Sequence, residues 1–224
     1  MRGKTLLVLA GLLGAGLLGY RNLPPHLNPL ALDDPPGWLT SFKLRRLTAD
    51  QCASLLAEAN RRRLIASRPV ADSEGSCPLR NVVRVANFGS VQLSSSFLAS
   101  CPLALSSALY IEQQAKPLTR QLMASDLRQI DHLGSFACRN IYHRQQARRS
   151  EHATADALDV SGFRLADGRR VSVLQGWRSE TSHPWLVALL NNSCHYFGNA
   201  LGPEYNAAHA NHFHFGMRGQ GFCF

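Results

Sequence analysis

The stretch Ala208-His209-Ala210-Asn211-His212-Phe213-His214-Phe215 brings three of the nine histidines of the chain into six consecutive positions. Alternate residues of a β-strand point to the same face, so we expect His212 and His214 to present two imidazoles side by side from one strand. His209 lies three residues earlier and can fold back over the pair. Core packing rarely needs histidine at this density, so the pattern favours a metal site.

A second segment supplies the remaining ligand types. The pattern Ser150-x-His152-x6-Asp159 offers one more imidazole and a carboxylate. A set of two histidines and one aspartate leaves the fourth position of zinc open, as catalytic zinc sites require. Taken singly, a lone histidine is usually structural and a lone aspartate in a turn usually caps it.

The two motifs together resemble those of bacterial zinc peptidases that cleave peptidoglycan and share the Hedgehog/D-Ala-D-Ala peptidase fold. The resemblance is strongest to the branch known as the extensin-like C-terminal domain, and it covers roughly residues 48–224. The late His-x-x-His-x-His spacing is also that of penicillin-insensitive murein endopeptidases. By this resemblance the cofactor is Zn²⁺, and its ligands are His152, Asp159 and His214.

The resemblance also suggests a general base. Many carboxypeptidases of this fold carry a glutamate three residues before the last ligand, where this chain has Asn211. In the endopeptidase branch the first histidine of the pair lies beside the metal, which predicts His212 as the base. His209 would then orient the site or stabilise the oxyanion. Glu204 is either a carboxylate partner of the histidines or a turn residue.

Two residues are candidates for substrate binding. Relatives often carry an arginine on a strand near the metal that pairs with a substrate carboxylate, and Arg139 follows the expected strand 127–138 directly. Its planar fork suits that task, although an ordinary salt bridge would explain it equally well. Ser150 either binds the substrate backbone or caps the turn that carries His152.

Composition indicates a basic protein. The chain has 224 residues, with 24 Lys+Arg against 15 Asp+Glu, giving a net charge of +9. A basic surface attracts polyanions, but the arginines are scattered and no nucleic-acid-binding motif is present, so we predict no nucleic-acid partner. Such a surface is often only a solvated face.

The N-terminal region precedes the expected domain. Residues 1–20 combine a basic start with an uncharged apolar run, the pattern of a secretory signal or of a membrane anchor with its N-terminus in the cytoplasm. Residues 21–47 are rich in proline and are interpreted as a linker. The domain is expected over residues 48–224, in the periplasm and anchored to the inner membrane, or secreted if the signal is cleaved.

The six cysteines agree with an oxidising compartment, and no Cys-x-x-Cys pair is present. An even number predicts disulfides, for which about fifteen pairings are possible. We predict pairing between neighbours in the sequence: Cys52–Cys77, Cys101–Cys138 and Cys194–Cys223. Several buried free thiols are the alternative.

Local patterns predict an α+β fold, a small mainly antiparallel sheet flanked by helices. Thr48 and Gln51 form a capping box for a helix that reaches about residue 63. Further helices are expected from Ser100 to Pro117 and over 183–196. Strands are expected at 81–85, 89–93, 127–138 and 212–215, with a hairpin over 163–173 whose first strand starts at 157–160.

These observations predict zinc-dependent hydrolysis of a peptide bond in a peptidoglycan stem or cross-link. The absence of glutamate at position 211 favours an internal or cross-link bond over a terminal D-Ala. The main alternative is an inactive zinc-containing module that binds peptidoglycan or a partner protein. A periplasmic metal carrier is a third, weaker interpretation.

Overall fold

The computed structural model describes residues 11, 30–37, 39–219 and 222–224. The signal or anchor expected at 1–20 therefore lies outside the described residues, apart from the single position 11. Within the part of the chain that is described, no helix has the length and apolar character needed to cross a membrane.

One nine-stranded sheet runs through the described residues, and most of its neighbouring strands are antiparallel. The order is β1-β2-β3-β4-β5-β8-β7-β9, with β6 paired to β5 outside this path. The pairs β3–β4 and β7–β9 are parallel. The strands are β1 (Ala66–Pro69), β2 (Val82–Phe88), β3 (Val91–Ser100), β4 (Leu127–Gly134), β5 (Ala157–Leu165), β6 (Arg170–Ser172), β7 (Asn199–Leu201), β8 (Phe213–Gly216) and β9 (Phe222–Cys223).

Helices complete the α+β fold class, which is confirmed. The α-helices are α2 (Thr40–Arg45), α3 (Ala49–Arg61), α4 (Cys101–Tyr110), α5 (Lys116–Met123), α6 (Val173–Gly176) and α7 (His183–Ser193). Short turns are η1 (Ile111–Ala115), η2 (Ile141–His143), η3 (Glu151–Thr154) and η4 (Ala207–His209). The capping box expected at Thr48 and Gln51 is present at the start of α3.

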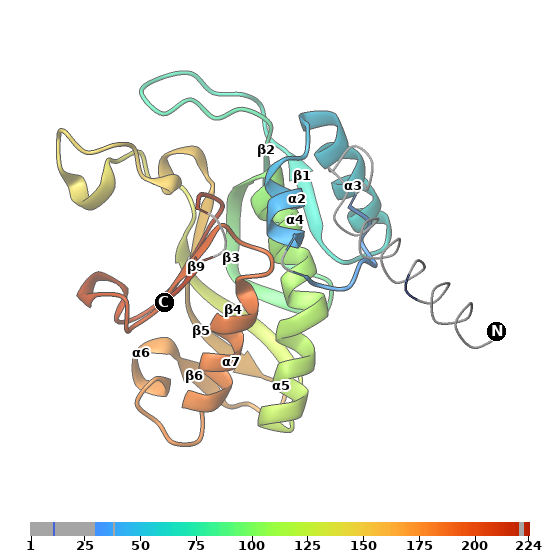
Figure 1. Ribbon diagram of the computed structural model, residues 1–224, viewed down its shortest axis with the longest axis vertical. Coiled ribbons are helices and arrows are strands. Elements are labelled where there is room, and N and C mark those ends of the chain that lie inside the picture. The colour runs from blue at the N-terminus through green and yellow to red at the C-terminus, as the bar shows by residue number, and fades with distance from the viewer. Residues whose placement is uncertain (1–10, 12–29, 38, 220–221) are drawn as a thin grey trace.

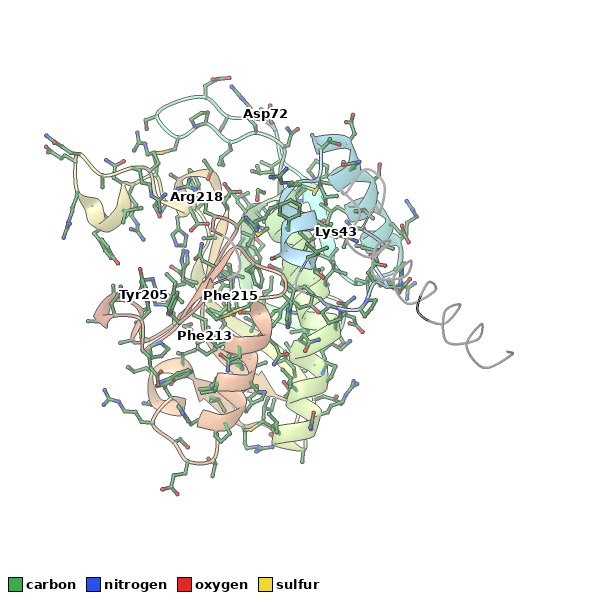
Figure 2. All side chains as sticks on the ribbon, in the orientation of Figure 1. Lys43, Asp72, Tyr205, Phe213, Phe215 and Arg218 are labelled. Atoms are coloured by element: carbon green, nitrogen blue, oxygen red, sulfur yellow. A yellow bond between two sulfur atoms is a disulfide. The ribbon has the colours of Figure 1, made fainter. Side chains whose placement is uncertain are left out.

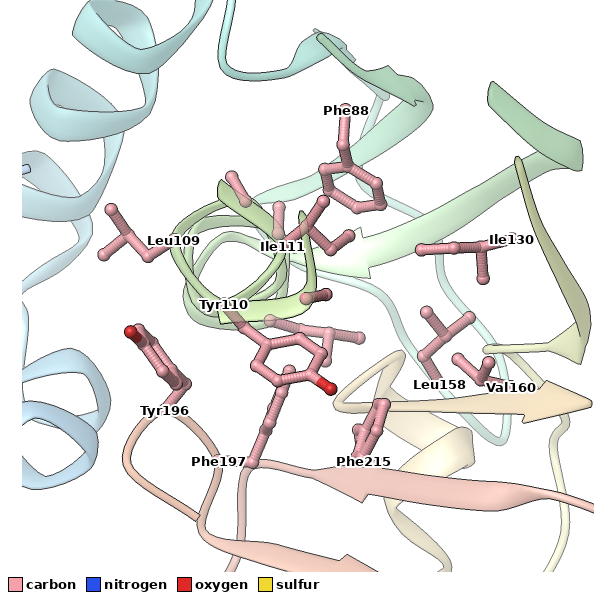
Figure 3. Close-up of a cluster of buried hydrophobic side chains, with 14 of the residues drawn as sticks. Phe88, Leu109, Tyr110, Ile111, Ile130, Leu158, Val160, Tyr196, Phe197 and Phe215 are labelled. Carbon is pink, nitrogen blue, oxygen red and sulfur yellow. The ribbon is translucent and has the colours of Figure 1, made fainter. Parts of the chain in front are cut away.

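The main core lies between the sheet and the helices α4, α5 and α7, which run along one side of it (Figure 1). Tyr110 of α4 is fully buried, packs on Phe197 and Phe215, and donates its hydroxyl to the Leu189 carbonyl at 2.9 Å. Leu158 of β5 faces the same core (Figure 3). Alternate residues of β5 and β8 must therefore point to the opposite side of the sheet.

The helix expected to end or bend at Pro117 continues as α5. A π-helical turn, η1, separates α4 from α5, and Pro117 lies within the first turn of α5. Proline lacks an N–H and crowds the preceding turn, and the wider π-turn accommodates both effects. The expected helix boundary is thus a local change of helix type.

Part of the segment interpreted as a linker belongs to the folded domain. Leu30, Leu32 and Leu44 are buried in the main core, and Gln113 donates to the Leu32 carbonyl. Proline content predicted a spacer, but α2, which carries Leu44, packs on α4, and the hydrogen bond from Gln113 ties Leu32 to η1. For the described residues 30–37 and 39–47, the linker interpretation is therefore wrong.

Three disulfides are formed, and two of the expected pairings are wrong. Cys194–Cys223 is confirmed, whereas the other bonds are Cys52–Cys101 and Cys77–Cys138. Cys52 lies in α3 and Cys101 starts α4, and these two helices pack together. Pairing follows tertiary neighbours, which proximity along the sequence does not capture.

Candidate metal centre

Strand register places Asp159 beside His214. The two residues are paired directly between β5 and β8. Their neighbours Leu158, Val160 and Phe215 point into the core, so the carboxylate and the imidazole emerge together on the face of the sheet away from the helices. His214 Nδ1 lies 2.9 Å from Asp159 Oδ1.

The short turn η3 positions His152. Ser150 caps this turn, its hydroxyl accepting from the backbone N–H of His152 at 3.4 Å. The ring donates its Nδ1–H to the Ser135 carbonyl at 3.0 Å, which leaves Nε2 free toward the site. That Nε2 lies 3.2 Å from Asp159 Oδ2. Of its two expected roles, Ser150 therefore fills the structural one.

His152, Asp159 and His214 form a compact set whose ligand atoms all lie within 4.8 Å of one another. Burial opposes ionisation of Asp159, but hydrogen bonds from both histidines outweigh it and hold its pKa below the usual value. Burial likewise opposes charging of His214, yet Asp159 and Glu151 raise its pKa to about 9. The set therefore contains an ionised carboxylate that attracts a cation.

His209 and His212 stand beside this set. The ring centroid of His209 lies 5.2 Å from that of His212 and 5.8 Å from that of His214, so it folds back as expected. His212 precedes β8 and places Nε2 3.6 Å from Asp159 Oδ1. Its Nδ1 donates to Asn211 Oδ1 at 2.8 Å.

Both of these flanking histidines are neutral at neutral pH. Burial, with repulsion from nearby histidines, lowers the pKa of His209 to about 4. Burial also lowers the pKa of His212, against the opposing attraction of Asp159. Asn206 accepts the Nδ1–H of His209 at 2.8 Å. Each ring thus keeps an unprotonated Nε2, the form that a general base requires.

The four histidines line a cleft with a volume of about 680 Å³. Its walls come from the loop around η2, from η3 and from the loop around η4. Tyr205 and Arg218 are among its lining residues and lie on the side of the molecule away from Lys43 of α2 (Figure 2). The expected site residues that line the cleft are Arg139, Ser150, His152, Asp159, His209, His212 and His214.

Arg139 lies in the cleft wall but not on a strand. β4 ends at Gly134, whose φ of +120° interrupts the extended backbone, and Arg139 follows in the loop before η2. Within the described residues, no ion pair or side-chain hydrogen bond engages its guanidinium. The ordinary salt bridge considered for Arg139 is therefore not found there.

Glu204 does not contact the histidines. It is exposed in the turn before η4 and lies outside the cleft lining, so the turn interpretation fits. Two residues missing from the sequence analysis hold the imidazoles instead. Asn206 accepts from His209, and Glu151 Oε2 lies 3.5 Å from His214 Nε2. For Glu151, the signal available in the sequence was its position next to the candidate ligand His152.

The donor set fits a divalent metal ion. It offers two imidazole nitrogens and one carboxylate oxygen, and each imidazole has its other nitrogen at an oxygen of the protein. Such outer contacts fix ring orientation in metal sites. Fold and site together define an α+β domain with a His–Asp–His cluster, suited to a metal, at the base of an open cleft.

The family comparison then places the chain. It belongs to the family described as Extensin-like protein C-terminus, whose model matches residues 50–224. No curated protein and no solved structure gives a match.

Proposed function

We propose that this protein is a zinc-dependent peptidase that hydrolyses a peptide bond in peptidoglycan stems or cross-links. The supporting observation is the cluster of His152, Asp159 and His214 with two neutral histidines beside it in an open cleft. Zinc on such ligands is a Lewis acid that polarises a peptide carbonyl and lowers the pKa of water to about 7.

His212 serves as the general base in this proposal. Its Nδ1–H is held by Asn211, so Nε2 accepts a proton from the water that adds to the peptide carbonyl carbon. The C–N bond then breaks, and His212 returns the proton to the departing amine. His209, whose Nδ1–H is held by Asn206, orients the site beside His212.

Arg139 suits the acidic substrate. Peptidoglycan stems are rich in carboxylates, and the guanidinium of Arg139 lines the cleft with no protein anion as partner in the described part of the chain. A bidentate pair with a stem carboxylate would fix the register of the peptide. The resemblance to murein endopeptidases and the asparagine at 211 favour an internal or cross-link bond.

The setting proposed for this activity is the periplasm. Three disulfides suit an oxidising compartment, and the first twenty residues have the composition of a signal or membrane anchor.

The direct test is digestion of purified cross-linked peptidoglycan by the full-length protein with its disulfides formed, with zinc or with chelator. Mass spectrometry of the products would show new zinc-dependent fragments, and their masses would identify the bond. His214→Ala and His212→Ala should abolish them, whereas His195→Asn, outside the cleft lining, should not.

Full activity of His214→Ala would contradict the proposal. Tightly held zinc and co-sedimentation with the wall, without any cleavage, would instead establish the binding module.

A further inference from the structure

Glu151 has its carboxylate directly behind the candidate metal ligand His214. Its Oε2 lies 3.5 Å from His214 Nε2, on the side of the ring away from Asp159. The same carboxylate accepts from the Arg218 backbone N–H at 2.7 Å and from Asn199 Nδ2 at 2.9 Å. Three donors from β7, β8 and the segment after β8 therefore converge on one side chain.

Burial of the Glu151 carboxylate costs free energy unless a positive group balances its charge. The Glu151 side chain is only 12% exposed, and among the described residues its one ion-pair partner is His214. The Arg218 guanidinium turns away and donates to the carbonyls of Arg149 and Ser150. Desolvated carboxylates need a charge or several hydrogen bonds, and here that balance depends on the imidazole.

The carboxylate of Glu151 fits beside His214 because the neighbouring residue 216 is a glycine, which has no side chain. A methyl group at Gly216 would lie 2.6 Å from Glu151 Oε1, and 2.7 Å from both Glu151 Oε2 and Asn199 Nδ2. Gly216 is the last residue of β8, two positions after His214. Any larger residue there would push the carboxylate from its place.

We infer that Glu151 is a positioning residue for the metal centre, which accepts the Nε2–H of His214 and so directs Nδ1 toward a bound divalent ion. This inference rests on the metal centre of the proposed function. It assigns Glu151 no contact with the substrate or with the ion itself.

Two physical effects follow from this contact. The hydrogen bond fixes the orientation and the tautomer of the ring. The side chain therefore loses less conformational freedom when the ion binds. The charge matters as well, because Asp159 and Glu151 together balance the double charge of a divalent cation in a poorly solvated place. Removal of such an outer partner weakens metal affinity about 10- to 100-fold in known metal sites.

The test is a competition titration of the full-length, disulfide-bonded protein with zinc and a chromophoric chelator. Glu151→Ala should bind zinc about 10- to 100-fold more weakly. Glu151→Gln, which keeps an oxygen acceptor but loses the charge, should recover part of the affinity. Gly216→Ala, whose methyl group would displace both the carboxylate and the Asn199 amide, should weaken zinc binding too.

Asn199→Ala is the matched control. It removes another contact of the same carboxylate but leaves the His214 contact intact, so its zinc affinity should stay close to that of the wild type. The visible spectrum of bound Co²⁺ adds a readout of ligand geometry. We expect it to change in Glu151→Ala and to be unchanged in Asn199→Ala.

Wild-type zinc affinity together with a wild-type cobalt spectrum in Glu151→Ala and Glu151→Gln would overturn this inference alone. A wild-type protein that binds no zinc would overturn both the inference and the proposed metal centre. Loss of folding in Glu151→Ala would show as a lower melting temperature of the chelated protein, and Glu151→Gln, nearly equal in shape, would then decide.

Discussion

His152, His209 and His212 each donate Nδ1–H to a carbonyl or amide oxygen, whereas His214 turns Nε2 toward Glu151. The nitrogen left facing the cluster is thus Nε2 in three rings and Nδ1 in the fourth. Protein oxygens outside the cluster determine the tautomer of every ring. The chemistry of the site depends on those oxygens as much as on the histidines.

Replacement of His212 tests its role as the base. We expect His212→Gln to lower kcat for peptidoglycan cleavage by about 10²- to 10⁴-fold, because general-base catalysis is lost, with bound zinc retained. Product release followed by mass spectrometry, together with zinc analysis of the purified variant, would measure both effects. Asn211→Ala is the milder comparison, since it releases Nδ1 but keeps the ring. Undiminished kcat in His212→Gln would assign the base to another group.

The metal-free protein should lose stability as pH rises. Burial opposes charging of His214, but the hydrogen bonds that its ring donates to Asp159 and Glu151 raise its pKa to about 9 from the ordinary 6.5. Its contribution, on the order of 3 kcal/mol, is therefore fully present below about pH 6.5 and is lost as pH rises toward 9.

Urea unfolding of the chelated protein from pH 6 to 9.5 would measure this loss. His214→Gln, which has no titrating ring at this position, should show a flatter profile over that range. A wild-type profile as flat as that of the variant would contradict the assignment.

At the level of elements, the site depends on two devices. Register between β5 and β8 sets Asp159 against His214, and the capped turn η3 carries His152 to them. The side-chain alternation along each strand and the serine ahead of the short turn are local features of the sequence, whereas the register joins residues 55 positions apart.

Loss of the Ser150 cap should loosen η3. Ser150→Ala removes the acceptor of the His152 backbone N–H, and a lost cap costs about 0.5–2 kcal/mol. Zinc affinity should fall modestly, because the imidazole would be held less firmly. Denaturant unfolding and zinc competition would measure the two effects. Ser150→Thr, which keeps the hydroxyl, should behave like the wild type.

The sequence was most informative where residue type and residue spacing indicate the same local structure. The α+β class, the capping box at Thr48 and the strand beginning at Ala157 were predictable from local pattern alone. The short strands β1, β7 and β9 were not predictable from the sequence. They contain too few residues to show an alternating pattern, and their pairing depends on strands far along the chain. Glu151 was missed for the same reason, since its partner His214 lies in another element, whereas Asn206 caps η4 and holds His209 within that same short turn.

At the scale of the whole molecule, disulfides join segments that lie far apart in the sequence. Cys77 lies in the loop between β1 and β2, and Cys138 immediately precedes Arg139. This bond tethers the start of the cleft wall to a distant loop. Cys52–Cys101 instead joins two helices on the core side.

The two bonds should therefore differ in effect. They span 61 and 49 residues, and chain-entropy arguments give each about 4 kcal/mol of stabilisation. Replacing either pair by serine should lower the melting temperature. Only the Cys77/Cys138 double variant should also speed limited proteolysis within residues 139–149. Equal proteolysis of that segment in both variants would show that the bond does not restrain it.

Asn206 Nδ2 donates to the Tyr142 hydroxyl at 3.0 Å, so that a single hydrogen bond joins the loop of η2 to the loop of η4. Asn206 also accepts the Nδ1–H of His209, so this bond connects Tyr142 in one wall of the cleft to a histidine beside the candidate ligands. The orientation of the His209 ring therefore depends on two loops that lie far apart in the sequence.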